Sequence, residues 1–188
     1  MMTTNSEKPR VKVPRKATPR YLENSALHYL SRFSTSSVNL KRVMMRKVHR
    51  SAQHHDTDPD EGQALVDDMI ARFQRSGLLD DEAYATARAA SLHRRGNASR
   101  TIRGKLKQKG LGDDVIDLAL SALGDDDDDP ERTAAIRFAR RRRLGPFRVR
   151  QPAIEVREKH LAAMARAGFS YDIAKLIIDA GNEDDLTS

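Results

Sequence analysis

The sequence contains no cysteine, no tryptophan and no long apolar run. The lack of cysteine excludes disulfide bonds, thiol nucleophiles and cysteine-based zinc sites. No stretch of about 18 apolar residues occurs, so the sequence predicts no membrane-spanning helix. The nucleotide-binding motif GxxxxGK(S/T) and any nucleophile–base pair are also missing. We therefore expect a protein that is not an enzyme and that needs no cofactor.

Apolar residues are scarce as well, at 38%, and aromatic residues make up only 5% of the 188 positions. So little apolar material suits several thin helical layers better than one large core. From Tyr21 onward, apolar residues recur three and four positions apart, which is the spacing of an amphipathic helix. Glycines at 77, 110 and 168 follow such stretches and are expected to end helices. The pattern predicts an all-α protein.

The spacing also predicts where individual helices lie. A first helix is expected to bury one stripe, formed by Leu22, Ala26, Tyr29, Leu30 and Phe33. Residues 51–62 are polar and predict a loop. Leu118 and Leu176 are assigned to the apolar faces of later helices, the last of which is expected to end at Gly181.

Two segments resemble each other and indicate an internal repeat. The segment KGLGDDVIDLAL (109–120) aligns with AGFSYDIAKLII (167–178), which places Gly110 over Gly168. A weaker match places Ser37 over Ser99. The inferred unit is three helices in about 50–60 residues, used three times, which would give an elongated, curved array. One irregular helical domain with accidental similarity is the alternative.

This organisation predicts six segments along the chain. They are a disordered basic arm (1–19), a first repeat (20–77), a second repeat (78–124), an acidic linker (125–130), a third repeat (131–181) and a tail (182–188). No periodicity and no packed apolar contact are expected in the arm, which is rich in proline, lysine and arginine.

The net charge of +7 is distributed in blocks. Five aspartates occupy 125–129, whereas residues 132–150 hold eight arginines and no acid. Such blocks predict a polyanionic partner and an acidic counterweight within the chain. The candidate residues for binding nucleic acid or a partner are Arg94, Arg95, Arg100, Arg103, Lys105, Lys107, Lys109, Arg140, Arg141, Arg142 and Arg143.

Phosphate contact is the predicted use of helix 98–109, because phosphates require positive charge and no base-reading side chain. Arg140–Arg143 are expected to meet nucleic acid or the acidic surface of a protein partner. Apart from Gln108, the basic helix 98–109 lacks the asparagine and glutamine typical of adenine readers, so sequence-specific binding is not expected. Two alternatives remain open. Helix 98–109 could be a solvated face, and Arg140–Arg143 could pair with Asp125–Asp129.

A histidine cluster raises the question of a metal site. His49, His54 and His55 lie close to Asp56 and Asp58 in the sequence. They fall in or beside a loose polar loop, with no second cluster to complete a coordination sphere. We expect no metal site here.

Three strings resemble the RecX family of RecA regulators. They are GLLDDEAYA (77–85), RRGNASRTIRGKLKQKGL (94–111) and AGFSYDIAKLII (167–178), and the resemblance covers residues 21–180. It implies a cytoplasmic protein that lodges in the helical groove of the RecA filament on DNA. There it would hinder ATP turnover, strand exchange and filament growth in recombination, DNA repair and the SOS response.

The chain departs from the family in its basic arm, its loop at 51–62, its aspartate run and its dense arginines. We expect a monomer that contacts RecA and, through phosphates, DNA of any sequence, with no membrane association. A non-specific architectural DNA-binding protein without an ATPase partner is the first alternative, and a helical scaffold is the second. The charge blocks count against the scaffold.

Overall fold

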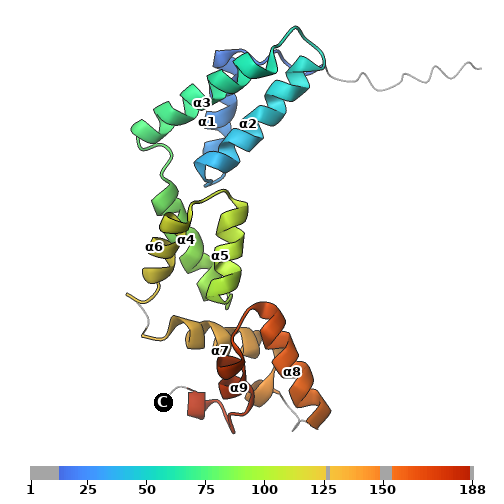
Figure 1. Ribbon diagram of the computed structural model, residues 1–188, viewed down its shortest axis with the longest axis vertical. Helices are drawn as coiled ribbons and strands as arrows, with labels where there is room; N and C mark the ends of the chain where they lie inside the picture. The colour runs from blue at the N-terminus through green and yellow to red at the C-terminus, as the bar shows by residue number, and fades with distance from the viewer. Residues whose placement is uncertain (1–12, 126–127, 149–153, 187–188) are drawn as a thin grey trace, which may run out of the picture. The chain divides into compact units, whose positions relative to one another are not determined.

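The computed structural model describes residues 13–125, 128–148 and 154–186. Over these ranges the chain forms nine α-helices and two short 3-10 helices, without a strand (Figure 1). This confirms the predicted all-α class and the order of three successive sets of three helices. The domain boundaries given above remain predictions. Contacts group the chain into two units, the first ending at Leu79 and the second comprising Thr35–Val38 and the chain from Asp80 onward.

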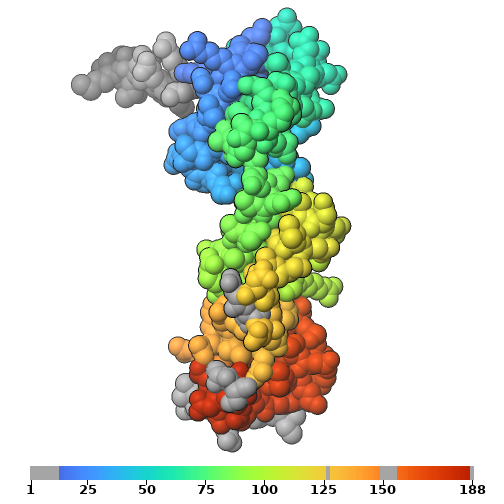
Figure 2. Space-filling view, turned by 90° about the vertical axis from the view of Figure 1, so that its left-hand side faces the viewer, coloured from blue at the N-terminus to red at the C-terminus, as the bar shows by residue number. Residues whose placement is uncertain are grey.

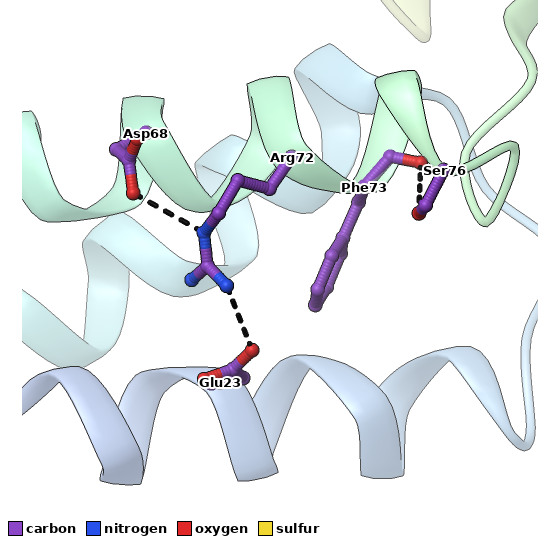
Figure 3. A network of polar contacts seen from close by, with 5 residues as sticks. All are labelled: Glu23, Asp68, Arg72, Phe73 and Ser76. Atoms are coloured by element: carbon purple, nitrogen blue, oxygen red, sulfur yellow. Dashed lines mark hydrogen bonds and ion pairs between the residues drawn. The ribbon is translucent and has the colours of Figure 1, made fainter.

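The first unit contains α1 (Pro19–Leu30), most of α2 (Ser37–Ala52) and α3 (Pro59–Arg75). Its core consists of buried apolar side chains from all three helices, among them Leu22, Ala26, Leu40, Met44, Val48, Val66, Met69 and Phe73. Gly62 lets α3 approach α2, because a Cβ at this position would lie 2.3 Å from Val48 Cγ1. On the surface, Arg72 of α3 pairs with Asp68 and, 3.1 Å away, with Glu23 of α1 (Figure 3).

The basic arm is corrected in part. Residues 1–12 lie outside the described residues, but Ala17 is buried in the core of the first unit. Its backbone N–H donates to the hydroxyl of buried Ser51 at 2.9 Å, and Thr18 caps α1. The prediction that residues 1–19 make no packed apolar contact is therefore wrong at Ala17, because the segment that precedes α1 packs against the end of α2.

Two further predictions for this unit are wrong at their edges. The loop at 51–62 is shorter, because α2 continues to Ala52 and α3 begins at Pro59, with Asp58 as its cap. The first helix ends at Leu30, so Phe33 lies beyond it and is 52% exposed.

The second unit contains two sets of helices. The first set is α4 (Asp81–Arg94), α5 (Ser99–Gln108) and α6 (Asp113–Ser121), which all contact one another. Its core is small and consists of Ala85, Ala89, Leu92, Ile102, Leu106, Leu111, Ile116, Ala119 and Leu123. Leu118 is corrected: it is 54% exposed, because α6 presents Ile116 and Ala119 to the core instead.

The other set is α7 (Pro130–Arg142), the 3-10 helix η1 (Gly145–Phe147), α8 (Ile154–Ala167), α9 (Tyr171–Ile178) and the 3-10 helix η2 (Asp184–Leu186). Arg157 of α8 forms a bidentate pair with Asp179, at 2.6 and 2.7 Å, and this lowers the pKa of that carboxyl. The predicted end at Gly181 is wrong by three residues, since α9 ends at Ile178. Leu176 is likewise corrected, because it is 48% exposed.

The same contacts recur at two places in the second unit. Ser37 donates its backbone N–H and hydroxyl to the carboxylate of Asp81, at 2.8 and 2.5 Å. Ser99 donates the same two groups to Glu131, at 3.0 and 2.6 Å. In both cases a carboxylate from the first turn of one helix caps the start of another. The aligned serines of the predicted repeat are therefore equivalent in structure.

The aligned glycines are equivalent too. Gly110 has φ +81°, and a Cβ there would lie 2.3 Å from Val38. Gly168 has φ +100°, and a Cβ there would lie 2.8 Å from the hydroxyl of Thr101. Each glycine ends a helix in the left-handed region and lets the first turn of an earlier helix approach closely, α2 at Gly110 and α5 at Gly168.

His160 gives the second unit a pH dependence. The backbone N–H of Gly145 donates to its Nδ1 at 3.0 Å, and burial, aided by the charge of Arg148, lowers the pKa of this histidine. A folded pKa below the ordinary value of about 6.5 means that the unfolded chain binds the proton first. The contribution of His160 to stability is therefore complete above about pH 6.5 and declines as the pH falls below it.

We expect His160→Asn to reduce the loss of thermal stability between pH 7.5 and 5.5, since the Asn amide oxygen can accept the Gly145 N–H without titrating. Melting curves of both proteins at the two pH values measure this. Equal losses in the two proteins would assign the pH dependence to another group.

Candidate nucleic-acid interface

All eleven predicted cations lie in the second unit, on three helical segments. Arg94 and Arg95 end α4. Arg100, Arg103, Lys105, Lys107 and Lys109 belong to α5 and its C-terminal cap, and Arg140–Arg143 end α7. The structure therefore divides the predicted site into an α4–α7 cluster, defined as 94–95 with 140–143, and an α5 cluster, defined as the five cations from Arg100 to Lys109.

The α4–α7 cluster is held together by backbone contacts. The guanidinium of Arg141 donates to the carbonyl oxygen of Arg95. Gly96, with φ +70°, lies directly against α7, since a Cβ there would be 2.7 Å from the backbone nitrogen of Phe138. Buried His93 adds a further contact, as its Nε2 lies 2.7 Å from the carbonyl oxygen of Pro130. The two parts of the cluster are more than 40 positions apart in the sequence, and the packing of α4 against α7 brings them together.

Aromatic rings orient three of the four consecutive arginines. The guanidinium carbons of Arg141 and Arg142 lie 5.5 and 6.0 Å from the ring centre of Phe138, and that of Arg140 lies 5.4 Å from the ring centre of Phe147. A cation–π contact uses the face of the guanidinium and not its N–H groups, so the N–H groups of Arg142 stay available to an anion. The fourth, Arg143, caps α7 in the left-handed conformation with φ 55° and is exposed.

The acid that neutralises part of this cluster comes from the end of the chain. Arg140 forms an ion pair with Glu183, and Arg132 donates to the carbonyl oxygen of Leu186 at 3.2 Å. The alternative in which the arginines pair with Asp125–Asp129 does not describe Arg140, whose acidic partner is Glu183.

The α5 cluster faces acids that sequence reasoning missed. Arg103 pairs with Asp117 and lies 3.6 Å from Asp113, which also accepts from Lys107 at 2.8 Å. The hydrogen bond from Lys107 lowers the pKa of the Asp113 carboxyl, and the charge of Arg103 adds to this. Lys105 donates to the side-chain oxygen of Asn97 at 2.6 Å. The three most central cations of α5 are thus engaged within the protein.

Six cations remain, of which Arg142 lies against the ring of Phe138 and the other five are available. Among the described residues, no ion pair or side-chain hydrogen bond engages the side chains of Arg94, Arg95, Arg100, Lys109 and Arg143. Arg94, Arg95, Arg100 and Arg143 are exposed, and Lys109 is half-buried. A surface of this kind offers donors and positive charge without base-reading groups, which suits phosphate oxygens.

Other kinds of site find no support in the described part of the chain. No group of three His, Cys, Asp or Glu side chains there could hold a metal ion. His55, part of the histidine cluster, has its Nε2 2.5 Å from the carbonyl oxygen of Pro14. None of the described helices combines the length and the apolar content that crossing a bilayer requires.

Comparison with known proteins yields consistent matches. Residues 80–120 match the family model described as RecX, second three-helix domain. The regulatory protein RecX of Myxococcus xanthus is 45% identical over 171 residues, which is 90% of each chain. The regulatory protein RecX of Agrobacterium fabrum is 30% identical over 87% of this chain and 85% of its own.

Solved structures show the same fold. A crystal structure of regulatory protein RecX superposes with a TM-score of 0.64 at 22% identity, covering 86% of this chain and 72% of the other. A crystal structure of RecX from Lactobacillus salivarius gives a TM-score of 0.64 at 20% identity, with 86% and 94% coverage.

Proposed function

Because this chain belongs to the RecX family of regulatory proteins, we propose that it binds the RecA–DNA filament and inhibits ATP turnover, strand exchange and filament growth. The observation that carries the proposal is the 45% identity to a regulatory protein RecX over 90% of both chains. The proposal includes action as a monomer in the cytoplasm, within DNA recombination, repair and the SOS response.

The charge distribution of the second unit supports contact with DNA in such a complex. Exposed, unengaged cations such as Arg100 and Arg143 can meet phosphates without reading bases. The α4–α7 cluster adds guanidiniums that aromatic rings hold in place. Acids from α6 and from the C-terminal segment reduce the net attraction to naked DNA, because they neutralise Arg103, Lys107 and Arg140. A protein that acts on a filament benefits from such moderation, since free DNA then competes less.

The DNA-dependent ATPase of RecA tests the proposal. We expect the full-length protein to slow ATP hydrolysis at concentrations too low to coat the DNA. Slowing only at coating concentrations would favour the non-specific architectural DNA-binding protein, which acts by occupying the DNA. A parallel titration with a generic cationic polymer, such as polylysine, provides the reference curve for coating of the DNA.

The α5 cluster supplies a prediction about DNA binding itself. Each phosphate neutralised contributes about −0.9 to the slope of log affinity against log salt on duplex DNA, and about −0.7 on single strands. Replacing both Arg103 and Lys107 with alanine should make this slope shallower by at most roughly 1–2 units on DNA of any sequence, because Asp113 and Asp117 compete with phosphates for these cations. Folding should survive, since both side chains are on the exposed side of α5.

The acids of α6 provide the matched variant. Asp113→Asn with Asp117→Asn frees the same two cations, so it should strengthen DNA binding at low salt and steepen the slope. Fluorescence anisotropy of labelled oligonucleotides over a salt series measures both variants. If neither variant changes the slope, Arg103 and Lys107 do not contact phosphates and only form ion pairs with α6.

A further inference from the structure

The first unit carries a basic groove that the predicted site does not include. It has a volume of about 510 Å³ and runs along α1, from the segment before the helix to His28 in its last turn. Its cationic lining consists of Arg15, Lys16 and Arg20, beside the polar side chains of Asn24, Ser25 and His28. No carboxylate is among the described residues that line it. Figure 2 shows part of this segment (blue) at the surface of the first unit.

The cations of this groove are not neutralised by any acid among the described residues. Glu23 is the one acidic residue of α1, and it pairs with Arg72 of α3 instead of lining the groove (Figure 3). In the described part of the chain, Arg15, Lys16 and Arg20 form no ion pair, although all three are exposed. This distinguishes them from Arg103, Lys107 and Arg140, each of which faces an acid.

The groove is also fixed in place. Ala17, between Lys16 and the cap residue Thr18, is buried in the core and is hydrogen-bonded to Ser51. Tyr21, which also lines the groove, is held by Lys47 of α2. The Lys47 ammonium lies 5.3 Å from the centre of the Tyr21 ring and donates to the Tyr21 hydroxyl at 3.4 Å. The start of α1 adds the partial positive charge of the helix dipole to that of the cationic side chains. The segment before α1 and the Tyr21 side chain are therefore held in place before an anion binds.

We infer that this groove is a second nucleic-acid site, which binds the sugar–phosphate backbone of DNA through Arg15, Lys16 and Arg20. Its charged groups and amide N–H groups are donors, and three cations within six residues match a chain of phosphates better than a single small anion. The choice of DNA as the polyanion rests on the proposed function. Because phosphates carry no sequence information, binding here is independent of sequence.

The test is DNA binding by the full-length protein in the absence of RecA. We expect the variant Arg15→Ala/Lys16→Ala/Arg20→Ala to have a salt slope shallower by about 2 units on single-stranded oligonucleotides and by roughly 2–3 on duplexes. Affinity at 0.1 M salt should fall roughly a hundredfold, as the three lost counterion-release terms predict. The circular dichroism melt should be unchanged, because the three side chains are exposed.

Two further variants make the result decisive. Arg46→Ala/Arg50→Ala/Arg75→Ala removes three exposed cations of the same unit that do not line the groove, and should change the slope much less. Arg15→Lys/Arg20→Lys keeps the charge and should retain the slope of the parent protein. Equal losses in the two alanine triples would overturn the inference, because net charge alone would explain the binding. An unchanged slope in the folded groove variant would overturn it as well, and so would a groove variant that loses binding to anionic lipid vesicles but not to DNA.

These binding measurements, together with the RecA ATPase assay, separate this inference from the proposed function. A parent protein that binds DNA through the groove but leaves the RecA ATPase unaffected would contradict the proposed function alone. A groove variant that still inhibits RecA and still binds DNA normally would contradict the groove alone.

Discussion

Replacing Ile102 with alanine should destabilise the second unit by about 2–5 kcal/mol, the usual cost of truncating a buried isoleucine. Ile102 is fully buried, and it belongs to a core of nine buried residues from α4, α5, α6 and the turns that follow α5 and α6. Single domains are stable by about 5–15 kcal/mol, so this loss is a large fraction of the total. Because α5 carries five of the candidate cations on its other side, binding to DNA and to the filament should weaken with the fold.

Leu118→Ala is the matched control for Ile102→Ala. Leu118 lies on α6 of the same helix set, but it is 54% exposed, so its truncation should cost less than about 1 kcal/mol. Urea unfolding followed by circular dichroism compares the two. Similar losses would mean that α6 presents a different face to the core, and the assignment of this core would be wrong.

Gly96→Ala should be nearly as harmful, for a different reason. At φ +70° an alanine costs about 1–2 kcal/mol, and its Cβ would lie 2.7 Å from the backbone nitrogen of Phe138 and 2.9 Å from the carbonyl oxygen of Ala134. Backbone atoms of a helix cannot rotate away, so α7 must shift, and the total cost should be roughly 2–5 kcal/mol. The contact between Arg141 and Arg95 should be lost with it.

Two other glycines separate the causes. Gly77 has φ +73° and open space around it, so Gly77→Ala should show only the conformational cost of about 1–2 kcal/mol. Gly104 is helical with nothing within 4 Å, so Gly104→Ala should stabilise the protein by about 0.5–1 kcal/mol. Melting temperatures of the three variants should follow this order. A Gly96→Ala protein as stable as Gly77→Ala would show that the close approach of α7 is not tight.

Local signals in the sequence were enough to predict the helices and the repeat. The glycines at 77, 110 and 168 have positive φ, as helix ends require. The alignment of Ser37 with Ser99 anticipated two serines that are capped by carboxylates in the same way. These features depend on neighbours within a few residues or on direct repetition, and both are visible in a single sequence.

Contacts between helices could not be predicted in the same way. The α5 segment by itself contains five cations and no acid. Because α5 packs against α6, Asp117 lies against Arg103, and Asp113 lies against Lys107. The arm was assigned to solvent because nothing local reveals that Ala17 packs beside Ser51, 34 positions later. For the same reason, the groove along α1 became apparent only once the structure placed Glu23 against Arg72.

Binding of the labelled protein to the RecA–DNA filament, compared with DNA alone and RecA alone, tests the central claim most directly. The comparison should be made at about 0.3 M salt, where counterion release contributes little and phosphate contacts with naked DNA are weak. If the protein recognises the filament, its affinity for filaments formed with a non-hydrolysable ATP analogue should exceed that for either component at least tenfold. Equal affinity for the filament and for naked DNA would contradict the account and leave a non-specific DNA-binding protein.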